Sequence, residues 1–249
     1  MTTVVIGNSH AKAIKQANTR IKNPIGINQT YFARSWKTDV VRQGEHSRTR
    51  LLALPQQDGD FGIFLDEYDN FIVSAGGWFA ARNQLIDAKD PSHPLGYMAC
   101  AGWGFTPGNV PARVRITSVS VFRATVEAWI RQQSAVRLVQ HLVSVSRGRV
   151  ILQPWPPLSR ALKEDTDWII NKWYGENGSK AWFSFFTAQY AALENIASEL
   201  GARVVLLGYP LQDSLEDGFM DASLCSPDPF HANWTYGALV LDQIAPHVS

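Results

Sequence analysis

The stretch TVVIGNSH, residues 3–10, decides the fold class of this chain. Val4, Val5 and Ile6 form a short β-branched run that ends at Gly7, which is typical of a strand buried in a parallel sheet. Residues 10–17 follow at once and have good helix propensity. A strand that turns directly into a helix predicts an α/β protein.

The same pattern recurs along the rest of the chain. Apolar runs that stop at glycine, proline or another turn residue predict strands at 71–77, 149–152 and 204–208, with a further strand expected at 30–35. Apolar positions on one helical face predict helices at 122–143 and 179–200, and a last helix is expected at 234–244. Strands alternating with long helices predict a three-layer α/β/α fold with a mostly parallel central sheet.

The length of 249 residues suits one domain of this class, and we expect the whole of 1–249 to form it. Residues 87–120 contain four prolines and several glycines, and we expect a loop insertion or lid there, close to a site. Residues 18–60 are polar and rich in turn residues. Within them, we expect the arginine-rich stretch 42–50 to form solvated loops.

Composition excludes several classes of function. Lys and Arg number 23 against 22 Asp and Glu, so no strongly basic face for nucleic acid is expected. No apolar run is long enough to span a bilayer, and the first residues lack a secretory signal, so we expect a cytoplasmic protein. Neither Cys100 nor Cys225 belongs to a group with metal-ligand spacing, so neither a metal nor a cofactor is expected.

Ser9 is the first candidate for chemistry. In parallel sheets ligands bind beyond the carboxyl ends of the strands, and Ser9 follows the first strand at the start of a helix. Backbone N–H groups at a helix N-terminus favour developing negative charge. The alternative is that Ser9 only caps the helix. We expect a structural role for the neighbouring His10.

The second candidate lies near the other end of the chain, at Asp228 and His231. A carboxylate three residues before a histidine can orient the imidazole through one ring nitrogen, which leaves the other nitrogen to take a proton from a hydroxyl. The alternative is a surface turn with a solvated histidine.

Together, Gly7-Asn8-Ser9 and the Asp-x-x-His motif at 228–231 resemble the first and last sequence blocks of the SGNH (GDSL-like) hydrolase family. The segment 231–237 also resembles the His-x-Asn segment of that family. The resemblance implies an SGNH/flavodoxin-like fold with Ser9 as nucleophile, His231 as general base and Asp228 as its partner. It implies a serine esterase or deacylase that acts through an acyl-enzyme on a small or carbohydrate-linked ester.

The sequence departs from the family at two places. Asn8 replaces the usual Asp, at a position that is not the nucleophile. The resemblance implies an oxyanion hole built from the Ser9 N–H, a glycine N–H after the second strand and an asparagine after the third. Gly44 is the candidate for that glycine. The second departure is that no asparagine follows the third predicted strand directly: Gly76 and Gly77 stand there, and Asn83 comes a few residues later. All three are candidate donors to the oxyanion.

Two other functions stay open: an O-acyltransferase that uses the same triad on a glycan, and a non-catalytic binding module on this scaffold. We expect a small-molecule or acylated carbohydrate partner. Trp78, Trp103 and Trp155 are candidates for stacking on it, against ordinary packing under loops. No GxSxG, GxxxxGK[ST] or HExxH motif occurs.

Overall fold

The computed structural model describes residues 1–7, 10–32, 35–43, 46–54, 62–74, 98–103, 114–211, 215 and 217–248. Its centre is a five-stranded sheet in the order β11-β9-β6-β1-β2. These strands are β1 (Thr3–Gly7), β2 (Ile27–Phe32), β6 (Asn70–Ser74), β9 (Arg149–Leu152) and β11 (Val204–Leu206). All four neighbouring pairs are parallel. Counted along the chain, the order is 2-1-3-4-5, as in doubly wound flavodoxin-like folds.

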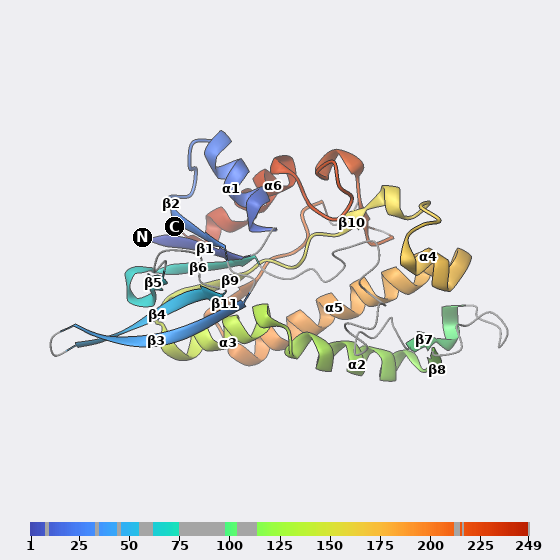
Figure 1. Cartoon of the computed structure of the whole chain (residues 1–249), viewed down its shortest axis with the longest axis horizontal. Helices are drawn as coiled ribbons and strands as arrows, with labels where there is room; N and C mark the ends of the chain where they lie inside the picture. The colour runs from blue at the N-terminus through green and yellow to red at the C-terminus, as the bar shows by residue number, and fades with distance from the viewer. Residues whose placement is uncertain are drawn as a thin grey trace.

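Helices cover both faces of this sheet (Figure 1). On one face lie α1 (Ala11–Arg20) and α6 (Trp234–Val248), and on the other lie α3 (Ser134–Val145) and the C-terminal part of α5 (Gly178–Leu200). Every residue of β1 and β6 is buried, which is why these strands are continuous apolar runs rather than alternating ones. The predicted three-layer α/β/α fold with a mostly parallel sheet is therefore confirmed.

The helix predicted at 122–143 is two helices. Helix α2 (Val119–Arg131) ends when the Gln132 N–H bonds the Trp129 carbonyl, and Gln133 is extended before α3 begins. The apolar spacing continues through the break because both helices bury a face in the same core. Periodicity alone does not reveal a break of this kind.

The expectation of solvated loops at 42–50 is wrong for its described residues, because 42–43 and 46–50 belong to two long paired strands, β3 (Ser35–Gln43) and β4 (His46–Leu54). In Figure 1 these two strands project away from the central sheet. β5 (Gly62–Phe64) pairs with β4, and Arg50 bonds Asp39 directly across the two strands. The strand expected at 30–35 lies three residues earlier, as β2.

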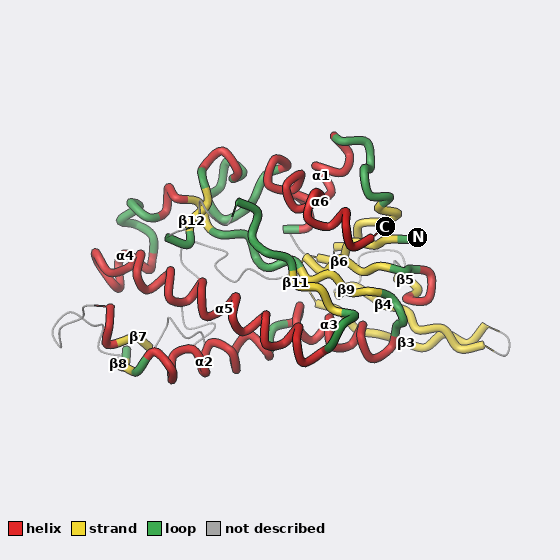
Figure 2. Tube along the Cα trace, turned by 180° about the vertical axis from the view of Figure 1, so that it is seen from behind, coloured by secondary structure: helices red, strands yellow, loops and turns green. Residues whose placement is uncertain are grey.

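The region expected to be an insertion, 87–120, is described at 98–103 and 114–120. There β7 (Met98–Cys100) pairs in parallel with β8 (Arg115–Thr117), and α2 begins at Val119. Figure 2 shows this pair near α4 (Ile169–Tyr174) and one end of α5. The short strands β10 (Leu158–Ser159) and β12 (Phe219–Met220) pair in the same part of the molecule.

Aromatic rings extend the core into that outer part, where Trp168 packs edge-on against Trp182 and Phe219. No helix of the described ranges combines the length and the apolar character needed to cross a membrane.

Candidate active site

The carboxyl end of β1 is where the site begins. Gly7 lies opposite Ser74, the last residue of β6, and a side chain on Gly7 would collide with the Ser74 carbonyl oxygen. It would also lie 2.7 Å from the Ala11 Cβ. A glycine therefore lets the start of α1 lie directly against the end of β6.

Asp228 and His231 meet as their spacing predicts. The Asp228 Oδ1 lies 2.8 Å from the His231 Nδ1 and also accepts the Phe230 N–H at 3.0 Å. Because an ionised carboxylate only accepts hydrogen bonds, Nδ1 carries the hydrogen, and Nε2 is the basic nitrogen of the neutral ring. The two side chains are 50% and 33% exposed, so solvent reaches this pair.

The Asn233 side chain joins the segment before the His231 loop to the helix after it. The Asn233 side-chain amide donates to the Ser223 carbonyl at 2.6 Å and to the Cys225 carbonyl at 3.0 Å. Its Oδ1 accepts the Thr235 N–H at 2.8 Å and so caps α6. The Ser226 N–H bonds the His231 carbonyl itself at 2.7 Å. These bonds fix the loop relative to the helix that follows it.

His10 connects the two ends of the chain. Its ring centroid lies 5.4 Å from that of His231, at an interplanar angle of 34°, and its side chain is buried. Burial, and then the neighbouring His231 charge, lowers the pKa of His10 to about 4, while Asp228 acts in the opposite direction. His10 is therefore neutral near neutral pH. His10, near one end of the chain, and His231, near the other end, thus lie together.

Two buried polar side chains, one at the carboxyl end of β9 and one on α6, were missed by sequence analysis. Gln153 follows β9, its backbone N–H bonds the Val73 carbonyl at 3.0 Å, and its side chain is buried. Tyr236 of α6 is buried beside it. Burial raises the pKa of the Tyr236 phenol, and the interaction with Gln153 partly offsets this rise. Neither residue has a local sequence signal, since the contact joins a strand end to a helix far away in the chain.

Two of the predicted substrate-stacking tryptophans are part of the hydrophobic core. Trp155 is buried, and its ring lies edge-on to the Trp129 ring, with 6.2 Å between the two ring centroids. Trp103 is buried too, and its Nε1 donates to the Ser184 Oγ at 2.8 Å. Both rings are covered by neighbouring side chains, so neither presents an open face to a sugar, contrary to the expectation.

The remaining predicted site residues lie outside the described residues: Ser9, Gly44, Gly76, Gly77, Trp78 and Asn83. Among the described residues, no group of three or more His, Cys, Asp or Glu side chains is placed to hold a metal ion. Cys100 and Cys225 are both unpaired thiols.

No family model matches this chain, and no curated protein matches it either. Its structure is similar to the crystal structure of a DUF4886 family protein from Bacteroides uniformis ATCC 8492. The two share 12% sequence identity and a TM-score of 0.39, over 98% of this chain and 82% of that chain. A similarity at this level supports no conclusion about function.

Proposed function

We propose that this protein is a serine esterase or deacylase of the SGNH type, with Ser9, His231 and Asp228 as its triad. The observation that carries the proposal is the packing of His231 against His10. His10 is the residue that follows Ser9 in the sequence, and His231 is oriented by Asp228. The chain thus has a histidine that is oriented by a carboxylate and packs against the neighbour of a serine. Serine, histidine and carboxylate are the three residue types of a serine hydrolase triad.

In the proposed reaction the Ser9 hydroxyl attacks the ester carbonyl while the His231 Nε2 takes its proton. Asp228 stabilises the imidazolium that forms. The alcohol leaves with that proton. Water then attacks the acyl-enzyme carbonyl while His231 takes a proton from it, and the carboxylic acid leaves as that proton returns to the Ser9 oxygen. A neutral His10 supports the proton transfer to His231, because it adds no positive charge beside the imidazolium that forms.

The proposed oxyanion hole starts from the Ser9 N–H, with Gly44, Gly76, Gly77 and Asn83 as the further candidates. Helix α1 begins at Ala11, two residues after Ser9, and this supports the choice, since the positive end of a helix dipole favours an oxyanion beside it. The substrate is proposed to be a small or carbohydrate-linked ester, and a cytoplasmic location stays a prediction.

The proposal is tested by the rate of acetate release from an acetylated sugar. We expect Ser9→Ala and His231→Ala each to lower kcat/KM by about a thousandfold or more, as loss of a triad member does. The matched control is His247→Ala, in the last turn of α6, which we expect to retain the wild-type rate within about twofold. Equal rates in Ser9→Ala and the wild type would contradict the proposal.

A further inference from the structure

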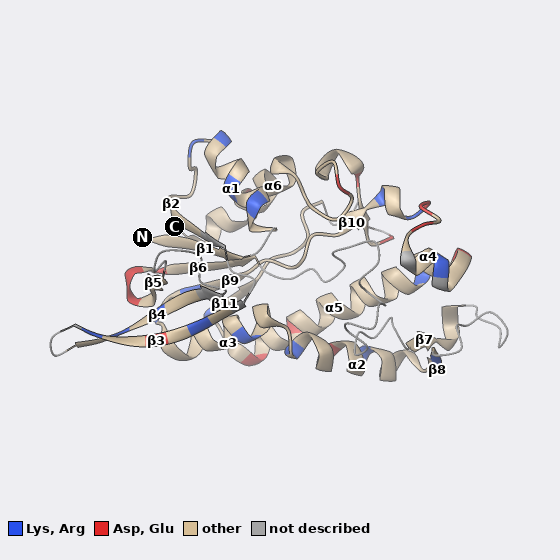
Figure 3. Cartoon of the chain, in the orientation of Figure 1, with Lys and Arg blue, Asp and Glu red and all other residues tan. Residues whose placement is uncertain are grey.

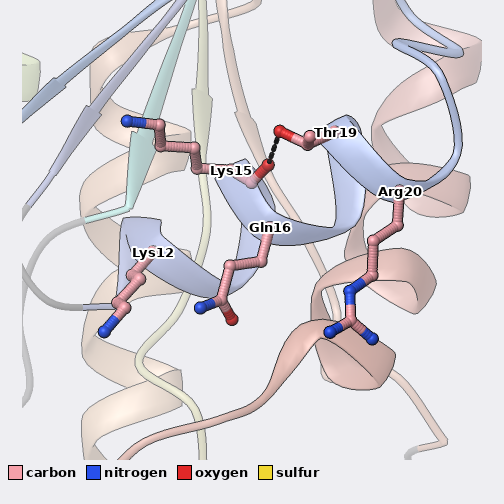
Figure 4. A pocket seen from close by; sticks show the side chains of 5 residues that line it. All are labelled: Lys12, Lys15, Gln16, Thr19 and Arg20. Atoms are coloured by element: carbon pink, nitrogen blue, oxygen red, sulfur yellow. Dashed lines mark hydrogen bonds between the residues drawn. The ribbon is translucent and has the colours of Figure 1, made fainter.

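The outer face of α1 borders a concavity whose edge carries polar and basic groups. Lys12, Lys15, Gln16, Thr19 and Arg20 line a concavity of about 490 Å³ (Figure 4). Lys12, Gln16 and Arg20 are spaced four residues apart, so they form one row on the helix. Figure 4 shows their side chains projecting from the same side of α1. We call these three residues the α1 row.

The charge of this helix is of one sign. Helix α1 carries two lysines and one arginine, and no acidic residue. In the part of the chain that the structure describes, no ion pair includes Lys12 or Arg20. Figure 3 shows basic residues on α1 with no acidic residue on that helix, whereas Arg48, for example, is paired with Asp66 and Glu67. The positive charge of the α1 row is therefore available to a ligand.

The Arg20 end of the α1 row lies next to the segment that carries His231. Lys12 begins the row two residues after His10, on a face of the helix turned away from the buried His10 side chain. At the other end the Arg20 guanidinium lies 4.6 Å from the ring centroid of Trp234, three residues after His231. The Trp234 side chain is partly exposed, at 37%. Arg20 and Trp234 thus lie next to the loop that carries His231.

We propose that the α1 row, with Trp234, binds the acidic part of the ester substrate, an oligosaccharide that carries carboxylate groups. The two cations attract carboxylates, the Gln16 amide can bond sugar hydroxyls, and the exposed part of the Trp234 ring offers an apolar surface to a sugar face. From Lys12 to Arg20 the helix rises about 12 Å, enough for more than one charged group.

A nucleic acid is the weaker choice of ligand for this surface. A protein that makes roughly six to ten phosphate contacts along a nucleic acid uses a lysine or arginine for most of them, more than the three cations of α1 supply. The assignment of the bound chain as substrate rests on the proposed esterase function, whereas its binding does not. The two can therefore be tested separately.

Binding is measured by calorimetry on the Ser9→Ala protein, with pentagalacturonate as the charged probe and maltopentaose as the neutral one. We expect pentagalacturonate to bind and maltopentaose to bind much more weakly, and we expect added salt to reduce the difference. In the Lys12→Gln/Arg20→Gln background the affinity for pentagalacturonate should fall about fivefold for each charge removed. The matched control is Lys180→Gln, the same change on the exposed start of α5, which should leave this affinity unchanged.

Equal affinities for the two sugars, or an unchanged affinity in the double variant, would overturn the proposed site. Tighter binding of a short RNA than of pentagalacturonate would overturn the choice of an acidic sugar. For the active protein, the ratio of kcat/KM on acetylated pentagalacturonate to that on acetylated maltopentaose should fall in the double variant only. Charge-dependent binding without any ester hydrolysis would contradict the esterase and the substrate assignment together, while the binding site itself would stand.

Discussion

At the scale of single residues, the exposure of Asp228 sets how much its charge contributes. Removing the carboxylate of a fully buried triad lowers turnover by about ten thousandfold. Asp228 is half exposed, so water screens its charge and also solvates the imidazolium directly. We therefore expect Asp228→Asn to lower kcat by only about ten- to a hundredfold, measured by ester hydrolysis.

The asparagine in this variant can still accept the Phe230 N–H, so the turn should persist and the melting temperature should change little. The matched control is Asp242→Asn on the exposed side of α6, which should keep the wild-type kcat. A loss as large as that of His231→Ala would contradict the screening argument.

His10 predicts a dependence of stability on pH. Its pKa falls from 6.5 to about 4 on folding, so the unfolded chain binds more protons between those two values. Unfolding free energy should therefore be lost as the pH falls from about 6.5 to about 4, by about 3 kcal/mol in total for this group. Urea denaturation at pH 7.0 and pH 4.5 measures the change.

The test variant is His10→Gln, which cannot take up a proton and should flatten this part of the stability profile. His247→Gln, in the last turn of α6, serves as the control and should keep the wild-type slope. The same slope in His10→Gln as in the wild type would mean that another group causes the dependence.

At the scale of elements, the close approach of β1, β6 and α1 depends on Gly7. A methyl group there would meet the Ser74 carbonyl and the Ala11 side chain, so the strand end and the helix start must separate. We expect Gly7→Ala to lower the free energy of unfolding by about 1 to 3 kcal/mol, as overpacking does. Gly102→Ala is the control, because its added methyl group meets no atom within 4 Å.

Equal urea midpoints for the two glycine variants would show that the β1–α1 junction tolerates a side chain. Activity of Gly7→Ala should also fall, since Gly7 is two residues before Ser9 in the sequence and the same junction sets the start of α1.

The loop before α6 depends on one amide, Asn233. Asn233→Ala removes the helix cap and both bonds to the Ser223 and Cys225 carbonyls. We expect a loss of about 1 to 2 kcal/mol in unfolding free energy, with a fall in kcat because the position of His231 is no longer fixed. Asn195→Ala, which removes a single surface bond to Glu127, should change neither quantity appreciably.

The central elements could be predicted from the sequence because each buried strand is a short apolar run that ends at a turn residue. The paired strands β3 and β4 could not, since their faces are only partly buried and their charged pairs, such as Arg50 with Asp39, appear only once the strands are aligned. Asp228 and His231 are close in sequence, so their contact was predictable. The contacts of Gln153 with Tyr236 and of His10 with His231 join distant segments and leave no local pattern.

At the scale of the whole molecule, the strand order explains why the two sequence ends meet. In a 2-1-3-4-5 sheet the chain switches direction between the first and third strands, here β1 and β6, and ligands bind at the carboxyl edge there. Helix α6 packs on α1, and its Gly237 touches the α1 backbone at Ala13. The loop that precedes α6 therefore brings His231 to the end of β1.

The central claim is that Ser9 is a nucleophile activated by His231, and covalent labelling with a fluorophosphonate tests it most directly. Trypsin cuts after Lys12, so mass spectrometry of the labelled, folded protein should find one adduct on the peptide 1–12. The adduct should be missing from Ser9→Ala and much slower to form in His231→Ala. An adduct on any other peptide, or none on the folded protein, would contradict the claim.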